Sequence, residues 1–265
     1  MPFVDNDGAR IHWTSLGKGE PVVMVMGLGC ASALWFRVAP RLATAHRVIM
    51  LDNRGCGSTV VPQTLVYRVR QMASDVAAVL DAASAARAHV VGFSMGGMIA
   101  QQFALDFPSR VRSLTLLGTH PGGFWAVQAA PEVQRLLFAK DQMTAEESLH
   151  AMRPYTYARE TSDALFGEDA TVRLAHTPTL RGYRAQLYAL IGWQAYLDLP
   201  KLRVPTLVMH GLQDALIPPA NGRLLASRIE GARLVELERA SHWLTTDQTE
   251  RCVSEMQGHM QGHMP

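Results

Sequence analysis

The stretch His89–Gly97, HVVGFSMGG, decides the fold that this sequence predicts. His89–Phe93 is a short apolar run of the kind that forms a buried strand. The glycines at 92 and 96 enclose Ser94, and a helical pattern follows from about Met95 to Phe107. This order predicts a strand, a sharp turn and a helix, with Ser94 at the turn. Glycine suits positions 92 and 96 because a side chain there would crowd neighbouring backbone.

The segments around this turn predict a mostly parallel sheet. Short apolar runs alternate with helical patterns such as 69–86, and the runs are continuous rather than alternately polar and apolar. Such runs are typical of strands that helices cover on both faces, which is the arrangement of an α/β protein. The runs are Pro21–Met26, Arg47–Leu51, Val111–Leu117, Val204–Met209 and Ala232–Leu237.

The alternation stops between about residues 121 and 199, where no strong strand pattern occurs. This stretch is helix-like and rich in Trp, Tyr, Met and Leu. We therefore expect residues 1–120 and 200–265 to form one core domain, with 121–199 inserted as a helical cap. After a last helix at about Asp247–Met256, the repeated Met-Gln-Gly-His segments are expected to form a frayed end.

A serine at such a turn is a weak nucleophile unless a base accepts its proton. The chain supplies Asp214 and then His242, each shortly after an apolar run, and the carboxyl ends of parallel strands collect catalytic groups. Asp198 precedes its strand, and His210 precedes the acid instead of following it. We therefore predict the triad Ser94, Asp214 and His242.

Acyl transfer also needs donors for the oxyanion of the tetrahedral intermediate. The first predicted donor is the amide of Met95, and the second is the amide of Leu28, in the loop Met26–Gly29. Predicted substrate contacts are Gly27, Trp125, Trp193 and Trp243. Other cap residues offer apolar surface with polar tips, or cations that suit a carboxylate: Met143, Met152, Tyr155, Tyr157, Tyr183, Tyr188, Tyr196, Arg153, Arg159 and Arg184.

The composition and net charge of the chain argue against some classes of binding partner. The 265 residues are 48% hydrophobic and 18% charged with a net charge of +2, which favours neither nucleic acid nor an anionic membrane. Three separated cysteines without a Cys-x-x-Cys pair favour reduced thiols and argue against structural zinc. We expect a cytoplasmic protein without a cofactor or a metal. The oligomeric state stays open.

Five stretches of the chain resemble the α/β-hydrolase superfamily: MGLG at 26–29, DNRGCGS from Asp52, GFSMGGMIAQQFALDFPSRV from Gly92, HGLQDALIP from His210, and SHW at 241–243. The most similar group is that of esterases and 3-oxoadipate enol-lactonases. The resemblance implies a mostly parallel eight-stranded sheet flanked by helices, with a helical cap after strand six. Asp52 and Arg54 are then structural. One departure is Met26, which stands where the family usually has histidine.

These observations predict a serine hydrolase that cleaves a carboxylic ester or lactone of a small, fairly hydrophobic molecule through an acyl-enzyme. Four alternatives stay open. The same triad serves thioester hydrolysis, acyl transfer to another nucleophile and carbon–carbon hydrolysis of a diketone. The fourth is a ligand receptor on the hydrolase fold that turns over slowly or not at all.

Overall fold

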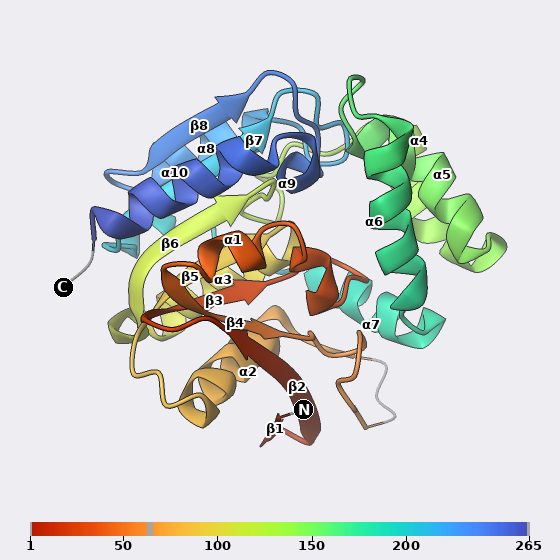
Figure 1. Cartoon of the computed structure of the whole chain (residues 1–265). Helices are drawn as coiled ribbons and strands as arrows, with labels where there is room; N and C mark the ends of the chain where they lie inside the picture. The colour runs from red at the N-terminus through yellow and green to blue at the C-terminus, as the bar shows by residue number, and fades with distance from the viewer. Residues whose placement is uncertain (1, 63–65, 264–265) are drawn as a thin grey trace.

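The computed structural model describes residues 2–62 and 66–263. Its centre is an eight-stranded sheet with the order β1-β2-β4-β3-β5-β6-β7-β8 (Figure 1). β2 pairs antiparallel with both β1 and β4. The strands that follow in this order, β4, β3, β5, β6, β7 and β8, run parallel to one another, which confirms the predicted sheet. The strands are β1 (Phe3–Asn6), β2 (Ala9–Leu16), β3 (Glu20–Val25), β4 (His46–Leu51), β5 (Ala88–Phe93), β6 (Val111–Leu117), β7 (Thr206–Gly211) and β8 (Arg233–Leu237).

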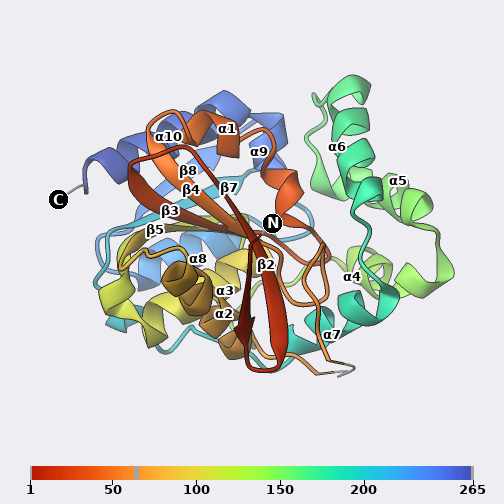
Figure 2. The ribbon, with the colours of Figure 1, turned by 60° about the horizontal axis from the view of Figure 1, so that its bottom comes forward.

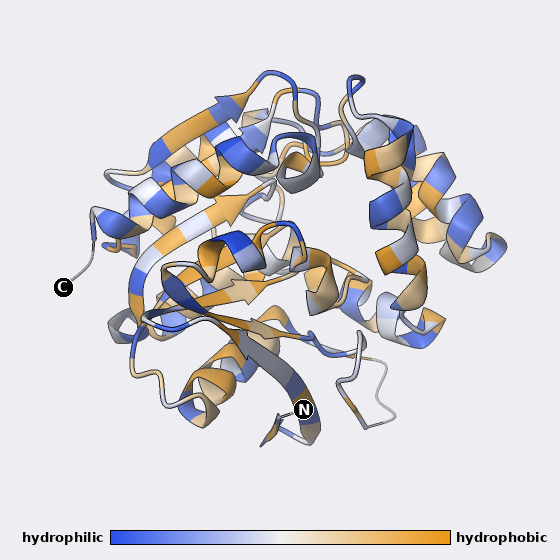
Figure 3. Cartoon of the chain, in the orientation of Figure 1, coloured by the Kyte–Doolittle hydropathy of each residue, from blue (hydrophilic) through white to orange (hydrophobic). Residues whose placement is uncertain are grey.

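Successive side chains of the central strands enter two different cores. In β3, Val23 and Val25 belong to one apolar cluster, whereas Val22 and Met24 belong to the other. All four are fully buried, because strand side chains alternate between the faces and both faces are covered. The apolar colour of β3 shows the same continuous pattern (Figure 3).

Helices cover both faces of the sheet (Figure 2). On one face lie α2 (Val69–Ala82), α3 (Met95–Asp106) and α8 (Ala220–Arg228), and on the other lie α1 (Ala39–Leu42) and α10 (Thr249–Gln261). The short elements are η1 (Ser32–Trp35), η2 (Pro108–Arg110), η3 (Ala139–Gln142), η4 (Leu199–Lys201) and α9 (Leu244–Asp247). Within the described ranges, no helix combines the length and the apolar character that crossing a bilayer requires.

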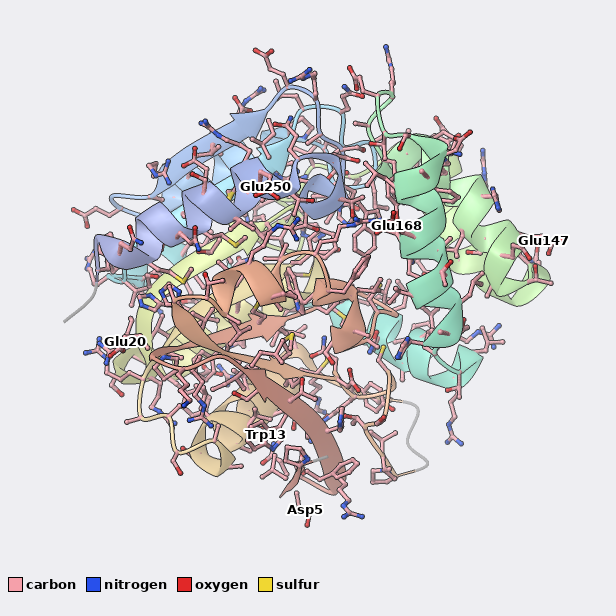
Figure 4. All side chains as sticks on the ribbon, viewed as in Figure 1. Asp5, Trp13, Glu20, Glu147, Glu168 and Glu250 are labelled. Atoms are coloured by element: carbon pink, nitrogen blue, oxygen red, sulfur yellow. The ribbon has the colours of Figure 1, made fainter. Side chains whose placement is uncertain are left out.

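The chain between β6 and β7 holds α4 (Pro131–Phe138), α5 (Ala145–Thr156), α6 (Asp163–Ala175) and α7 (Leu180–Leu190). These helices stand together beside the sheet rather than on either face, and we refer to residues 121–199 as the cap (Figures 1 and 2). Arg37 ties α6 to the rest of the chain through Glu168 at 2.8 Å and buried Asp169 at 3.0 Å. Figure 4 places Glu168 at this junction and Glu147 at the outer edge of the cap.

Two loops after the strands are fixed by buried charged groups. The guanidinium of Arg54 donates to both carboxylate oxygens of Asp75, at 2.7 and 2.8 Å. The Asp52 carboxylate accepts the amides of Ser32 and Ser58 and faces His12 Nδ1 at 2.9 Å. Asp52 and Arg54 therefore have the structural role that the sequence predicts.

The end of the chain differs from the prediction. α10 continues to Gln261, and His259 and Met260 are buried instead of frayed. Met256 and Met260 are one helical turn apart and both pack into the core. The prediction of a frayed tail was wrong because the repeat contains this apolar spacing.

Candidate active site

Ser94 lies at the sharp turn between β5 and α3, as the sequence predicts. Its backbone has φ 57° and ψ −121°, a left-handed conformation that non-glycine residues rarely adopt. A Cβ at Gly92 would lie 2.3 Å from the Gly96 carbonyl oxygen, and one at Gly96 would lie 2.0 Å from that of Val25. The glycines therefore allow the backbone contacts that hold the strained serine.

The structure brings Ser94, His242 and Asp214 together from three separate loops. His242 Nε2 is 3.0 Å from Ser94 Oγ, and His242 Nδ1 is 2.8 Å from Asp214 Oδ2. The exposed fractions are 9% for Ser94 and 3% each for His242 and Asp214. This chain of contacts can move a proton from the hydroxyl to an imidazole that a carboxylate orients.

Backbone amides and a second histidine hold the Asp214 carboxylate. Oδ1 accepts the amides of Leu216 at 3.0 Å and Ile217 at 2.7 Å, and Oδ2 lies 3.5 Å from His210 Nε2. Burial alone raises the pKa of Asp214, but His242 and His210 together lower the pKa below its usual value. The carboxylate is therefore charged at neutral pH and available to orient His242.

The remaining histidines near the site are held in other roles. His210 Nε2 donates to the Ile217 carbonyl at 2.7 Å and so fixes the loop that carries Asp214. His120 lines the cavity, and its Nδ1 accepts the Gly122 amide at 2.9 Å. Burial, followed by the nearby His210 and His242, lowers the pKa of His120 to about 4, so its ring is neutral above that pH.

A cavity of about 170 Å³ opens over Ser94 between the sheet edge and the cap. Its lining is mostly apolar and comes from both parts of the chain. It includes the predicted residues Gly27, Leu28, Ser94, Met95, Met152, Tyr183, His242 and Trp243, together with Cys30, Phe93, Met98, Val127, Leu137, Thr156, Leu187, Leu190, Leu216 and Ile217. An apolar cavity with a few polar groups is the usual form of a small-molecule site.

Arg173 of α6 is the one arginine or lysine that lines this cavity among the described residues. Its guanidinium lies 4.9 Å from the centre of the Trp243 ring, and no carboxylate of the described chain forms a salt bridge with it. Arg153, Arg159 and Arg184 are the cap cations that the sequence suggests, whereas Arg173 has no local signal, because no pattern in the sequence shows which helix face meets the cavity.

The loop Met26–Gly29 lies against the serine turn. A Cβ at Gly27 would be 3.0 Å from Ser94 Cβ, so the backbone here is close to the serine. Leu28 and Met95 line the cavity, and neither amide has a hydrogen-bond acceptor within residues 2–62 and 66–263. Both amides are therefore available to a ligand. The Asn53 side chain donates to the Met26 carbonyl at 2.8 Å, a contact that no sequence pattern predicts.

Two of the predicted substrate contacts lie elsewhere. Trp125 is 49% exposed and stacks on Tyr196 with ring centres 4.5 Å apart. Trp193 donates its indole N–H to Gln102 at 2.9 Å. Neither residue lines the cavity over Ser94. Trp125 therefore lies at the surface of the cap, and Trp193 packs against α3 and the core beneath the cap, because an aromatic residue in the cap can pack against the core as well as against a substrate.

The model of the α/β-hydrolase fold family matches residues 20–247, which include all three residues that meet at the serine turn. The chain belongs to this family. It is therefore a hydrolase, and the resemblance to its esterase and enol-lactonase members is confirmed by the solved structures below.

Relatives of this hydrolase carry varied names. It is 32% identical to a poly(3-hydroxyalkanoate) depolymerase of Ectopseudomonas oleovorans, over 92% of this chain and 86% of that protein. It is 30% identical to a 2-hydroxy-6-oxo-2,4-heptadienoate hydrolase of Pseudomonas putida, over 91% and 89%.

Two solved structures are similar over nearly the whole hydrolase. One is an esterase from Exiguobacterium antarcticum, with a TM-score of 0.86, 26% identity and 98% of each chain covered. The other is an enol-lactonase from Burkholderia xenovorans, with a TM-score of 0.85, 25% identity, and 98% of this chain and all of that chain (100%) covered.

Proposed function

We propose that this hydrolase cleaves a carboxylic ester or lactone of a small, largely apolar molecule through an acyl-enzyme intermediate. The observation that carries this proposal is the contact of Ser94 Oγ with His242 Nε2 at 3.0 Å, at the floor of the cavity. A buried hydroxyl that faces an imidazole oriented by a carboxylate is the arrangement that activates a serine.

In the first step, Ser94 Oγ attacks the carbonyl carbon while its proton passes to His242 Nε2. The electron pair of the C=O bond moves to oxygen, where the amides of Leu28 and Met95 donate to it. The tetrahedral intermediate then collapses, and the alcohol leaves with the proton from His242. With a lactone, the alcohol stays attached to the acyl group.

In the second step, water attacks the acyl-enzyme and gives its proton to His242. A second tetrahedral intermediate forms in the same amide pair. When it collapses, the bond from Ser94 Oγ to the acyl carbon breaks, His242 returns its proton to Oγ, and the carboxylic acid leaves. Asp214 stabilises the imidazolium of both steps and keeps its ring in place. This scheme uses no metal and no cofactor.

The cavity supports a substrate of modest size. Its volume of about 170 Å³ and its lining by Met98, Met152 and Leu187 favour an apolar acyl or alkyl group. The esterase and enol-lactonase among the similar structures agree with an ester or lactone bond. The cytoplasmic location expected from the sequence stays a prediction.

A second candidate reaction is carbon–carbon hydrolysis, and Arg173 favours it. The dienoate in the name of the Pseudomonas putida relative bears a carboxylate and no ester bond. Arg173 offers a cation without a salt-bridge partner to such a carboxylate inside the cavity. Arg173→Gln should then raise KM for carboxylated substrates at least tenfold and leave KM for neutral esters unchanged.

A substrate panel tests the proposal. It contains p-nitrophenyl esters from acetate to decanoate, aliphatic lactones, a thioester and a 2-hydroxy-6-oxo-dienoate, with product analysis by mass spectrometry. We expect steady turnover of an ester or lactone, with a maximum at short or medium chain length. Turnover of the dienoate alone would establish the second candidate. A burst without turnover on any substrate would favour the receptor.

A further inference from the structure

We propose that Gln186 of the cap is a positioning residue that sets the oxyanion hole. Through it, α7 holds the loop Met26–Gly29, so the cap takes part in the chemistry and does more than enclose the substrate. The proposal rests on the proposed function, because it assigns the Leu28 amide to the oxyanion.

The side chain of Gln186 joins two loops of the core. Oε1 accepts the amide of Gly29 at 2.8 Å. Nε2 donates to the carbonyl of Arg54 at 2.7 Å and lies 3.1 Å from the sulfur of Cys56. The residue has an exposed fraction of 0%, so these contacts have no competition from solvent. A carboxamide suits this place because it supplies an acceptor and a donor at once.

α7 lies in close contact with the same two loops, through its backbone at Gly182 and through the ring of Tyr183. A Cβ at Gly55 would lie 2.8 Å from Gly182 Cα, one turn before Gln186. A Cβ at Gly29, which has φ +69°, would lie 2.9 Å from the Tyr183 ring. Side chains at these glycines would push the helix away. The close approach therefore gives the Gln186 hydrogen bonds a fixed geometry.

Leu28 lies between two anchored neighbours. On one side Asn53 Nδ2 donates to the Met26 carbonyl at 2.8 Å, and on the other side Gln186 accepts from Gly29. The Gly27 carbonyl also accepts the Cys30 amide at 3.2 Å, which closes the turn. Both anchors spare the Leu28 amide, which stays available to the cavity. These two hydrogen bonds hold the loop in place of the histidine that the family usually carries at the position of Met26.

The experiment compares Gln186→Leu with Gln102→Leu. Gln102 is a matched control because it is also a buried glutamine that joins core and cap: its Oε1 accepts the indole N–H of Trp193 at 2.9 Å, and neither residue lines the cavity. Each protein is assayed with p-nitrophenyl butyrate, and its affinity for a trifluoromethyl ketone is measured. That ketone adds to the serine and places an oxyanion in the amide pair.

For Gln186→Leu we expect kcat to fall by about 10- to 100-fold with KM changed less than about threefold. Affinity for the ketone should fall by the same factor as kcat. Deuterium exchange of the peptide that contains residues 27–36 should accelerate. Gln102→Leu should keep kcat and the ketone affinity within about threefold. If Gln186→Leu does not fold, Gln186→Met serves with the same expectations, because methionine keeps the length and flexibility of the side chain.

Three results would overturn the proposal: unchanged kcat, a fall in kcat without loss of ketone affinity, or unchanged deuterium exchange of the loop. Absence of turnover by the wild-type protein is a different result, because it counts against the ester or lactone reaction. The exchange measurement still tests the contact between Gln186 and the loop in that case.

Discussion

At the scale of the residue, the two carboxylate oxygens of Asp214 have different roles: one anchors the carboxylate, and the other orients His242. Oδ1 accepts two backbone amides, which fix the carboxylate in its loop. Oδ2 faces His242 Nδ1 at 2.8 Å, which fixes the imidazole. The His242 ring is therefore held in the orientation in which Nε2 faces Ser94. The contact between His242 and Ser94 thus depends on Asp214, which does not touch the substrate.

Asp214→Asn should lower kcat by up to about 10⁴-fold, because the amide cannot stabilise the imidazolium and favours the wrong tautomer. Steady-state kinetics on the best ester of the panel measures the loss. Asp198→Asn is the control, since Asp198 pairs with Lys201 at the surface and should leave kcat unchanged. The opposite pattern, with Asp198 sensitive and Asp214 tolerant, would show that the acid is misassigned.

The site residues that lie shortly after a predicted strand could be predicted from the sequence. Ser94, Asp214 and His242 each follow a strand of the parallel part of the sheet, and parallel strands bring their carboxyl ends to one edge. Gln186 and Arg173 are important in the structure but have no such signal. Their roles depend on which face of α7 or α6 meets the core, and tertiary packing decides that.

At the scale of the element, the six parallel strands β3 to β8 were predictable from the sequence, whereas the inner face of the cap was not. Strands covered on both faces carry apolar residues toward both, as Val22–Val25 of β3 show. The cap carries apolar residues in its loops and on several faces of its helices, so Trp125 and Met152 look alike in sequence. In the structure Met152 lines the cavity, whereas Trp125 stacks on Tyr196.

Met152→Ala should shift substrate preference toward longer acyl chains. The substitution removes a side chain from the cavity wall, and we expect kcat/KM for hexanoate relative to butyrate to rise about tenfold. Trp125→Ala is the matched control and should leave this ratio unchanged. An equal effect of both variants on every ester would mean that the cavity over Ser94 is not the acyl pocket.

At the scale of the whole molecule, the two ends of the sheet differ in their titratable groups. His46 and His89 begin β4 and β5 at the end opposite Ser94, with ring centres 6.1 Å apart. Burial and the neighbouring cations lower the pKa of His89 to about 4, and burial with His263 and Arg233 lowers that of His259 to about 4. These buried rings resist protonation while the chain is folded.

Stability should therefore fall as the pH drops from about 6.5 to about 4. In that range the unfolded chain binds protons at His89, His120 and His259 that the folded chain does not, so the free energy of unfolding rises with pH. Burial raises the pKa of Asp247 to about 6 and also raises the pKa of Asp75, and both carboxyl groups give the opposite slope, but these are two groups against three.

Thermal unfolding from pH 4 to 8 measures the effect. His259→Gln should make the fall in Tm below pH 6.5 less steep than in the wild-type protein. Since the glutamine of this variant does not titrate, the difference in Tm between the two proteins should depend on pH. A constant difference across the range would contradict the assignment of this slope to His259.

The most direct test of the account is the chemistry at Ser94. Wild-type protein and Ser94→Ala are compared for ester or lactone turnover and for labelling by a fluorophosphonate, with circular dichroism to verify folding. The account predicts that the wild-type protein is labelled at Ser94, and that Ser94→Ala stays folded, loses the label and loses turnover by about 10⁴-fold or more. Labelling at another residue, or near-wild-type turnover by folded Ser94→Ala, would contradict it.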